Sequence, residues 1–324
     1  MKLLYELSGE NQELAAAELA CVARITERAN GIAVAETDVP EESTRLADTH
    51  IVSELLGVCN GTAEDLQHLL QSLSIEADKP YCCRARKIHP AVEPESMTAV
   101  ERMMGSQIKG TVSLKHPEIV YRAVFTGGLC WFGRVLYEID RGSYASRNPN
   151  SRAYFHPGVM MPLFARAIVN LTRVKKGETL LDPFCGTGGI LLETELLGVK
   201  GVGSDFDSQM LAGSRLNVPA ANLIRADATS MPYQDASFHA VACDFPYGQS
   251  TAVGAETFSA LYSGALREIR RVLKKGGRAV VVTHQDIRPF AAAAGFTVEG
   301  FYEQYIHKSL TRRILVLNNG YSRT

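Results

Sequence analysis

The chain has 324 residues, of which 46% are hydrophobic and 21% charged, and its formal net charge is −1. This composition is typical of a globular protein with more than one hydrophobic core. No apolar run approaches the length of a membrane-spanning helix, and the start Met1-Lys-Leu-Leu-Tyr-Glu6 turns acidic too soon for a signal peptide. We therefore expect a cytoplasmic protein without a membrane partner. The seven cysteines include no C-x-x-C pair, so we expect neither a disulfide framework nor a metal site.

The first 140 residues show the strand and helix patterns of an α+β region. Over residues 1–60 we predict a small unit, with a strand at 2–7, a helix at 10–26 and a strand at 31–36. Residues 61–140 are predicted to form a second module, with a helix starting at Thr62, a basic strand at 81–88, a helix at 99–108 and strands at 119–126 and 129–139. Residues 141–154, rich in Ser, Asn and Arg, are predicted to be a linker.

Charge is distributed unevenly along the chain. Residues 1–78 hold four Lys or Arg against fifteen Asp or Glu, whereas residues 79–150 hold eleven against six. A long acidic segment thus masks a basic one, which is compatible with nucleic-acid binding despite the neutral total. A charged strand edge that only discourages aggregation is the alternative. The candidates for a phosphate-binding face are Arg84, Arg86, Lys87, Arg147 and Arg152, with Arg122, Arg134 and Arg141 on the same stretch of chain.

The first functional motif within residues 155–324 is a turn that contains glycines. The buried-strand pattern at 178–181 and the helical pattern at 190–197 place Gly186 and Gly188 in a strand-to-helix loop. Glycines there let the backbone approach a ligand closely and leave the helix N-terminus open. Leu192 stands where the third glycine of G-x-G-x-x-G would be, and no Gly-Lys-Ser/Thr follows, so a pyrophosphate cofactor is disfavoured.

Four predicted strands end in an aspartate, at Asp182, Asp205, Asp227 and Asp244. A single aspartate at such a position often caps a helix. Four in register indicate instead a ligand site at the carboxyl edge of a doubly wound sheet. Asp205 lies about twenty residues beyond the glycine loop, where such folds place the acid that holds ribose hydroxyls.

These motifs resemble a known family. Asp182-Pro-Phe-Cys-Gly-Thr-Gly-Gly189, with the later acids and Asp244-Phe-Pro-Tyr247, resembles the S-adenosylmethionine-dependent methyltransferases that modify exocyclic amines, whose fourth strand ends in Asn/Asp-Pro-Pro-Tyr/Phe. The chain is more similar still to the archaeal tRNA guanosine-10 N2-methyltransferases. Phe155-His-Pro-Gly-Val-Met-Met-Pro162 looks like that family's segment before the first strand, and 309–317 looks like its last strand.

The resemblance implies a domain plan and partners. It implies an α/β fold, with a Rossmann-like class I methyltransferase domain over 155–324 preceded by a ferredoxin-like region over 1–60 and an RNA-binding THUMP domain over 61–140. It further implies a tRNA substrate, S-adenosylmethionine as cofactor and a small zinc-binding activating subunit. The residues expected to bind the cofactor are His156, Pro157, Asp182, Pro183, Phe184, Gly186, Thr187, Gly188, Asp205, Phe206, Asp227, Ala228 and Asp244.

The Asp244-Phe-Pro-Tyr247 motif suits an attack by a base amine, whose lone pair is delocalised into the ring. A carboxylate on Asp244 and a carbonyl of Phe245 or Pro246 would accept the two N–H groups and turn the lone pair outward, and Asp244 would take the proton. Tyr247 would stack on a base taken out of its helix. Core packing is the alternative for both aromatic residues. Phe245 departs from the family's proline, which leaves the rigidity of this loop open, and contact of the Phe245 ring with the base is a further alternative.

We therefore predict methylation of the N2 amine of guanosine in tRNA, at position 10, giving mono- and dimethylguanosine. The alternatives are another amine methyltransferase, acting on DNA adenine, ribosomal guanine or protein glutamine, and a non-catalytic RNA-binding protein with a degenerate cofactor fold. The basic N-terminal module favours RNA, and the intact glycine loop with Asp244 favours an enzyme.

Overall fold

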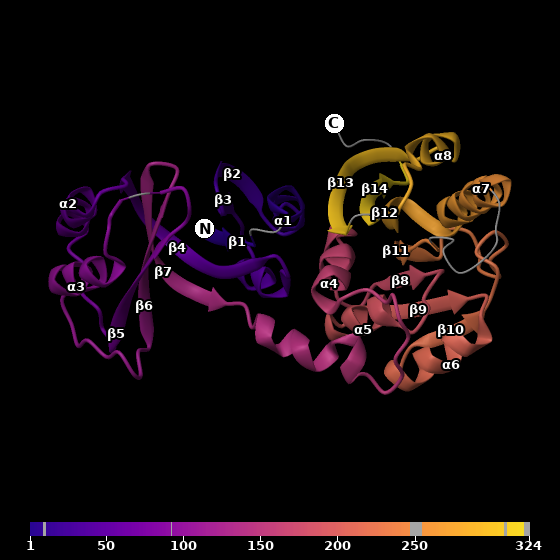
Figure 1. The fold of residues 1–324 in the computed structure, drawn as a ribbon, viewed down its shortest axis with the longest axis horizontal. Coiled ribbons are helices and arrows are strands. Elements are labelled where there is room, and N and C mark those ends of the chain that lie inside the picture. The colour runs from indigo at the N-terminus through magenta and orange to yellow at the C-terminus, as the bar shows by residue number, and fades with distance from the viewer. Residues whose placement is uncertain (9–10, 92, 247–254, 308–309, 321–324) are drawn as a thin grey trace. The chain divides into compact units, whose positions relative to one another are not determined.

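The computed structural model describes residues 1–8, 11–91, 93–246, 255–307 and 310–320 (Figure 1). The chain divides into two compact units, an N-terminal unit, Met1–Asp140, and a C-terminal unit, Arg141–Thr324. Within the described residues, no helix is both long and apolar enough to cross a membrane.

The N-terminal unit is one seven-stranded sheet in the order β2-β3-β1-β4-β7-β6-β5. Its strands are β1 Lys2–Leu7, β2 Arg24–Ala29, β3 Ile32–Glu36, β4 Thr49–Asn60, β5 Tyr81–Lys87, β6 Ile119–Thr126 and β7 Leu129–Glu138, and its helices are α1 Gln12–Leu19, α2 Ala63–Leu73 and α3 Met97–Gln107. The long strand β4 pairs with β1 on one side and β7 on the other. The two modules predicted at 1–60 and 61–140 therefore share a single sheet.

Two elements near the N-terminus differ from the prediction. The helix predicted over 10–26 ends at Leu19, and β2 follows it over Arg24–Ala29. β2 and β3 form a hairpin in which Ala29 pairs with Ile32, so Asn30 and Gly31 make a two-residue turn. Gly31 has a φ of +73°. Asn-Gly is a strong signal for such a hairpin. The prediction instead extended the alanine-rich helical pattern through residue 26. β4 was not predicted either.

A buried ion cluster joins β1 to β5 and β6. Alternation along β1 and β6 puts Glu6 on the face of Leu4 and Arg122 on the face of Val124, and Leu4 and Val124 share one apolar cluster with Trp131. Glu6 is 1% exposed. Arg122 donates to it through Nε and Nη2, the latter at 2.9 Å from Oε2. Arg86 adds a third bond, with Nη1 at 3.1 Å from Oε2.

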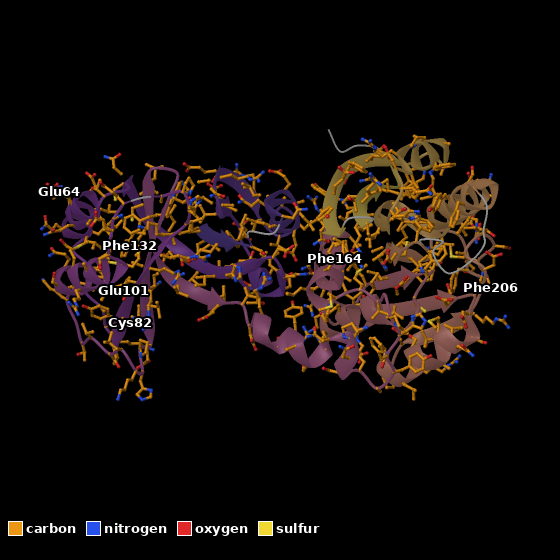
Figure 2. All side chains as sticks on the ribbon, viewed as in Figure 1. Glu64, Cys82, Glu101, Phe132, Phe164 and Phe206 are labelled. Atoms are coloured by element: carbon orange, nitrogen blue, oxygen red, sulfur yellow. The ribbon has the colours of Figure 1, made fainter. Side chains whose placement is uncertain are left out.

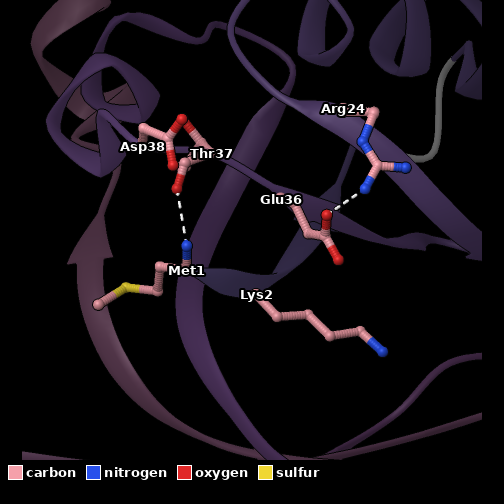
Figure 3. A pocket seen from close by; sticks show the side chains of 6 residues that line it. All are labelled: Met1, Lys2, Arg24, Glu36, Thr37 and Asp38. Atoms are coloured by element: carbon pink, nitrogen blue, oxygen red, sulfur yellow. Dashed lines mark hydrogen bonds and ion pairs between the residues drawn. The ribbon is translucent and has the colours of Figure 1, made fainter.

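A shallow recess opens where β1 and β3 pair at the edge of this unit (Figure 3). The N-terminal amine of Met1 donates to the carbonyl of Thr37 at 2.9 Å, and Arg24 pairs with Glu36. The recess shares no residue with the sites predicted from the sequence.

The C-terminal unit is a second seven-stranded sheet, in the order β10-β9-β8-β11-β12-β14-β13. Its strands are β8 Thr179–Asp182, β9 Lys200–Asp205, β10 Asn222–Arg225, β11 Phe238–Asp244, β12 Leu273–Thr283, β13 Thr297–His307 and β14 Leu310–Asn318, and its helices are α4 Pro162–Leu171, α5 Gly189–Leu196, α6 Ser208–Asn217, α7 Ala255–Val272 and α8 Arg288–Ala293. The first five strands of the order run parallel, and β14 is antiparallel to β12 and β13.

Helices cover both faces of this sheet (Figure 1). Leu181, Val241, Val281 and Leu315 from four strands pack with α7 and α8 in one core. α4, α5 and α6 lie on the other face, where Leu191 of α5 packs against Leu211 and Val218. Residues 141–154, predicted as a linker, begin this unit and contain two 3-10 helices, Arg141–Arg147 and Pro149–Ser151.

We predict that Glu6→Gln destabilises the N-terminal unit by about 2 to 4 kcal/mol, because the substitution leaves the half-buried Arg122 without its counter-charge. Trp131 is the only tryptophan of the chain and lies in the same apolar cluster, so its fluorescence in a urea titration reports this unit alone. Glu54→Gln breaks the more exposed pair with Arg134 and serves as control, with an expected loss below about 1 kcal/mol. Equal losses in the two variants would contradict the prediction.

Candidate functional site

The strand order of the C-terminal sheet reverses between β8 and β11, which lie side by side. Asp182 ends β8, Asp244 ends β11 and Asp205 ends the neighbouring β9. Three of the four predicted acids thus end strands at one edge of the sheet. Asp227 lies two residues beyond the end of β10. Ligands of doubly wound sheets bind at this edge, where the order reverses.

The loop from Asp182 to Gly189 has two glycines with different reasons to be there. Gly188 has a φ of +84°, and a Cβ on it would lie 2.7 Å from the hydroxyl of Ser214, so packing requires glycine. Gly186 has a φ of +49°, and a Cβ there would meet no atom within 4 Å. Gly186 therefore borders open space at the edge of the sheet, where a ligand can approach the backbone.

Asp205 holds this glycine loop in place. Its Oδ2 accepts the N–H of Gly186 at 2.9 Å, and its Oδ1 accepts the N–H of Asp207 at 2.9 Å. Each carboxylate oxygen has a second lone pair, so Asp205 retains acceptors for further hydroxyl groups. Burial raises the pKa of Asp205 above its ordinary value, although the two N–H donors oppose this shift.

Asp182 lies beneath the loop and is 2% exposed. Its Oδ1 accepts the N–H of Phe184 at 3.2 Å. Burial raises the pKa of Asp182 well above its ordinary value, and the charges of Asp205 and Asp244 raise it further. Asp182, Asp205 and Asp244 therefore lie close enough for their charges to raise the pKa of the innermost, Asp182.

On the other side of α5, three arginines surround one buried carboxylate. Glu193 accepts from Arg147 Nε at 2.8 Å and from Arg166 Nε at 2.9 Å. Arg152 donates through Nε to the carbonyl of Arg147 at 2.9 Å, and a Cβ on Gly189 would lie 3.2 Å from its Nη1. Within the described part of the chain, both terminal nitrogens of Arg152 are buried without a hydrogen-bond partner. In this cluster three arginines therefore lie near a single carboxylate.

These positions differ from the surface face that the sequence predicted for Arg147 and Arg152. Arg147 is bound to the buried Glu193, and burial lowers the pKa of Arg152. Arg166 and Glu193 were not predicted from the sequence as part of a site. Their signal is weak, because a charged residue inside a helical pattern is ordinarily exposed.

Phe245 packs in the core. Its side chain is 1% exposed, its ring centroid lies 4.8 Å from that of Phe184 and 5.4 Å from that of Tyr262, and its N–H donates to the carbonyl of Val282 at 2.9 Å. The packing alternative therefore holds for the Phe245 ring, which leaves the backbone as the part of this residue that can face a substrate. Pro246 is exposed. Tyr247 lies outside the described residues.

The remaining predicted cofactor residues border the same edge or the segment before α4. Phe206, directly after Asp205, is 69% exposed, with the guanidinium of Arg225 5.4 Å from its ring (Figure 2). Asp227 accepts the N–H and the hydroxyl of Thr229, each at 2.8 Å. The other positions divide by exposure: Pro183, Thr187 and Ala228 are buried, whereas His156 and Pro157 are exposed.

Comparison with known proteins assigns the family. Residues 149–314 match the RMKL-like methyltransferase domain family. The tRNA (guanine(10)-N2)-dimethyltransferase of Methanothermobacter thermautotrophicus is 32% identical over 342 residues, which cover 98% of this chain and 99% of the relative. The chain belongs to the family of tRNA (guanine(10)-N2)-dimethyltransferases. The enzyme of the same name from Methanocaldococcus jannaschii is 30% identical over 354 residues, covering 96% of this chain and 98% of the relative.

The fold is also that of solved methyltransferases. The crystal structure of TrmN from Thermus thermophilus covers 98% of this chain and 99% of its own, with a TM-score of 0.53 and 21% identity. Family membership and fold together confirm the predicted α/β class I methyltransferase, its enzymatic activity and S-adenosylmethionine as its cofactor. The roles of individual residues and the domain boundaries stay predictions.

We predict that Asp182→Asn stabilises the C-terminal unit increasingly as the pH rises. The pKa of Asp182 is raised in the folded chain, so the proton it retains stabilises the fold below the unfolded pKa near about 4, and this contribution is lost as the pH rises toward the folded pKa. Asparagine does not titrate. Calorimetry without cofactor should show the gain in Tm over wild type growing as the pH rises above about 4, with the exposed Asp235→Asn as control. A gain independent of pH would contradict the prediction.

Proposed function

We propose that this enzyme methylates the exocyclic N2 amine of guanosine in tRNA, at position 10, giving mono- and dimethylguanosine. The observation that carries the proposal is Asp244 at the end of β11, beside the open glycine loop of β8, in a chain that matches relatives of that name over almost its whole length. Mass spectrometry of nucleosides from unmodified tRNA, ribosomal RNA and DNA, each incubated with enzyme and labelled cofactor, tests the substrate. Label in any product other than N2-methylated guanosine from tRNA would contradict it.

The cofactor fits the residues at this edge. S-adenosylmethionine, when bound, supplies an electrophilic methyl group on a sulfonium, next to a nucleoside and an amino acid. The unpaired, buried donors of Arg152 at the N-terminus of α5 suit the carboxylate of that amino acid. The remaining acceptors of Asp205 suit ribose hydroxyls, and the exposed Phe206 beside it suits the flat face of the adenine. Arg152 is thereby reassigned from RNA to the cofactor.

The target amine is served by the end of β11. The Asp244 carboxylate and the carbonyl of Phe245 or Pro246 would accept its two N–H groups, which turns the lone pair toward the methyl group. Asp244 then takes the proton that the amine loses. Phe245 contributes by fixing this backbone, since its ring is packed between Phe184 and Tyr262. Stacking of the base on Tyr247 belongs to the same proposal.

The N-terminal unit would bind the tRNA, as a ferredoxin-like region over 1–60 and a THUMP domain over 61–140, and residues Arg84 and Lys87 of the edge strand β5 would contribute cations. Arg84 Nη1 donates to the carbonyl of Cys83 at 2.9 Å, so this head group keeps donors for phosphate, and Lys87 Nζ donates to the carbonyl of Pro94 at 3.2 Å. Arg86 is held by Glu6.

The proposal also includes a cytoplasmic location and a small zinc-binding activating subunit. Copurification from the native cell tests the subunit.

Two variants are predicted to separate the two ends of the cofactor. Arg152→Gln should weaken binding of S-adenosylhomocysteine by about 1.5 to 3 kcal/mol, because a charged hydrogen-bond partner of the carboxylate is lost. It should leave 5′-methylthioadenosine unaffected, since that ligand has no carboxylate. Asp205→Ala should weaken both ligands, because both carry the ribose. Calorimetric titration measures the four affinities. Equal losses for both ligands in Arg152→Gln would remove the carboxylate assignment, and unchanged affinities in Asp205→Ala would remove that residue from the site.

Asp244→Ala is predicted to slow methyl transfer at least about a hundredfold, the effect typical of losing a positioned acid–base group. Affinities for S-adenosylhomocysteine and tRNA should stay near wild type, because Asp244 acts on the amine during transfer. Single-turnover methylation of one tRNA transcript under saturating cofactor measures the rate, and Asp235→Ala, at an exposed acid of the same unit, is the matched control. Transfer by Asp244→Ala at close to the wild-type rate would show the proposed mechanism to be wrong.

A further inference from the structure

A basic groove lies at the amino edge of the C-terminal sheet, opposite the edge that carries the three acids. It is formed where β8, β11 and β12 begin, together with the segment after α4 and the end of β14. Its basic lining residues are Arg173, Lys175, His239, Lys274, Lys275 and Arg278. None of these was singled out from the sequence, because they come from three separate segments of the chain.

Charge in the basic groove is predominantly positive. Five Lys or Arg line it against two acids, Glu178 and Glu299. Glu299 is paired with Arg278, and Glu178 accepts the backbone N–H of Lys175 at 2.8 Å. The side chains of Lys175 and Lys275 are not neutralised by these acids, and both residues are exposed. The groove therefore favours an anionic occupant.

His239 and Lys274 are joined inside the groove. His239 Nδ1 lies 3.1 Å from the backbone nitrogen and 2.8 Å from the hydroxyl of Thr179, and its Nε2 lies 2.7 Å from Nζ of Lys274. An ammonium group has three donors and no acceptor, so Lys274 donates one N–H to Nε2 and has two others for an anionic oxygen.

We propose that the basic groove binds the phosphate backbone of the RNA substrate; this inference rests on the proposed function and extends the RNA-binding surface to the methyltransferase unit itself. Several cations spread along an open groove match a chain of phosphates better than one small anion. β11 runs from the groove to Asp244 over seven residues, about 20 Å at the usual rise of a strand. An RNA that presents one base at Asp244 can pass that distance to the groove.

The test is the salt dependence of tRNA binding in the double variant Lys175→Ala/Lys275→Ala. Each phosphate contact contributes about 0.7 to 0.9 to the slope of log affinity against log salt, so the slope should fall by about 1.5 and the affinity at low salt by about tenfold. Lys176→Ala/Lys200→Ala removes two exposed lysines of the same unit that do not line the groove, and it should bind like wild type. Affinity for S-adenosylhomocysteine and the Tm should be unchanged in both, which shows that each variant is folded.

The outcomes separate this inference from the proposed function. If wild type binds and methylates tRNA but the groove variant keeps the wild-type slope and affinity, the groove does not bind RNA and only this inference fails. If the groove variant loses binding of inorganic triphosphate while its tRNA slope is unchanged, the groove holds a small anion and the inference is again overturned. If wild type neither binds nor methylates tRNA, the proposed function fails, and this inference fails with it.

Discussion

The adjacency of β8 and β11 is the constraint on which the site depends. These strands are 60 residues apart in sequence at His239 and Thr179, yet they pair directly because the strand order reverses between them. The reversal places the loop after β8 and the motif after β11 on neighbouring strand ends. The next helices, α5 and α7, lie on opposite faces of the sheet, and this divergence is what opens the binding crevice of doubly wound sheets. An open backbone at Gly186 and a carboxylate at Asp244 then border the same space. Neither motif alone would be a site.

Both units bury a glutamate that holds more than one arginine. Glu6 binds Arg86 and Arg122, and Glu193 binds Arg147 and Arg166. A buried carboxylate is tolerated only where such partners satisfy it, and removing either side leaves an uncompensated charge. These clusters also explain why a run of basic residues is an uncertain sign of RNA binding. Part of the positive charge read from the sequence is used inside the protein, and part of the exposed positive charge lies in a groove whose basic residues come from three separate segments of the chain.

Phe245 stands where the family pattern has a proline, and packing holds its backbone in place. Proline would fix φ at this position through its ring, but it has no N–H. Phe245 uses its N–H to bond the carbonyl of Val282 on the neighbouring strand, and its ring is enclosed by Phe184 and Tyr262. Tertiary packing and one hydrogen bond therefore hold the backbone that a pyrrolidine ring would hold covalently. The carbonyls that follow Asp244 keep a fixed path as a result.

The sequence by itself determined what depends on neighbours along the chain: the strand ends at Asp182, Asp205 and Asp244, the glycine loop between β8 and α5, and most strands of both sheets. Buried runs, glycine positions and helix periodicity are local patterns, and the parallel sheet converts them into one edge. Only the tertiary structure decided where charges and rings point. Arg122 meets Glu6 across 116 residues and Arg147 meets Glu193 across 46, so no local pattern could show that they are paired. The hairpin of β2 and β3 is local, and its Asn-Gly turn is a signal within the sequence. The strand β4 was settled by the tertiary structure, because its hydrogen bonds run to β1 and β7, which lie far from it along the chain.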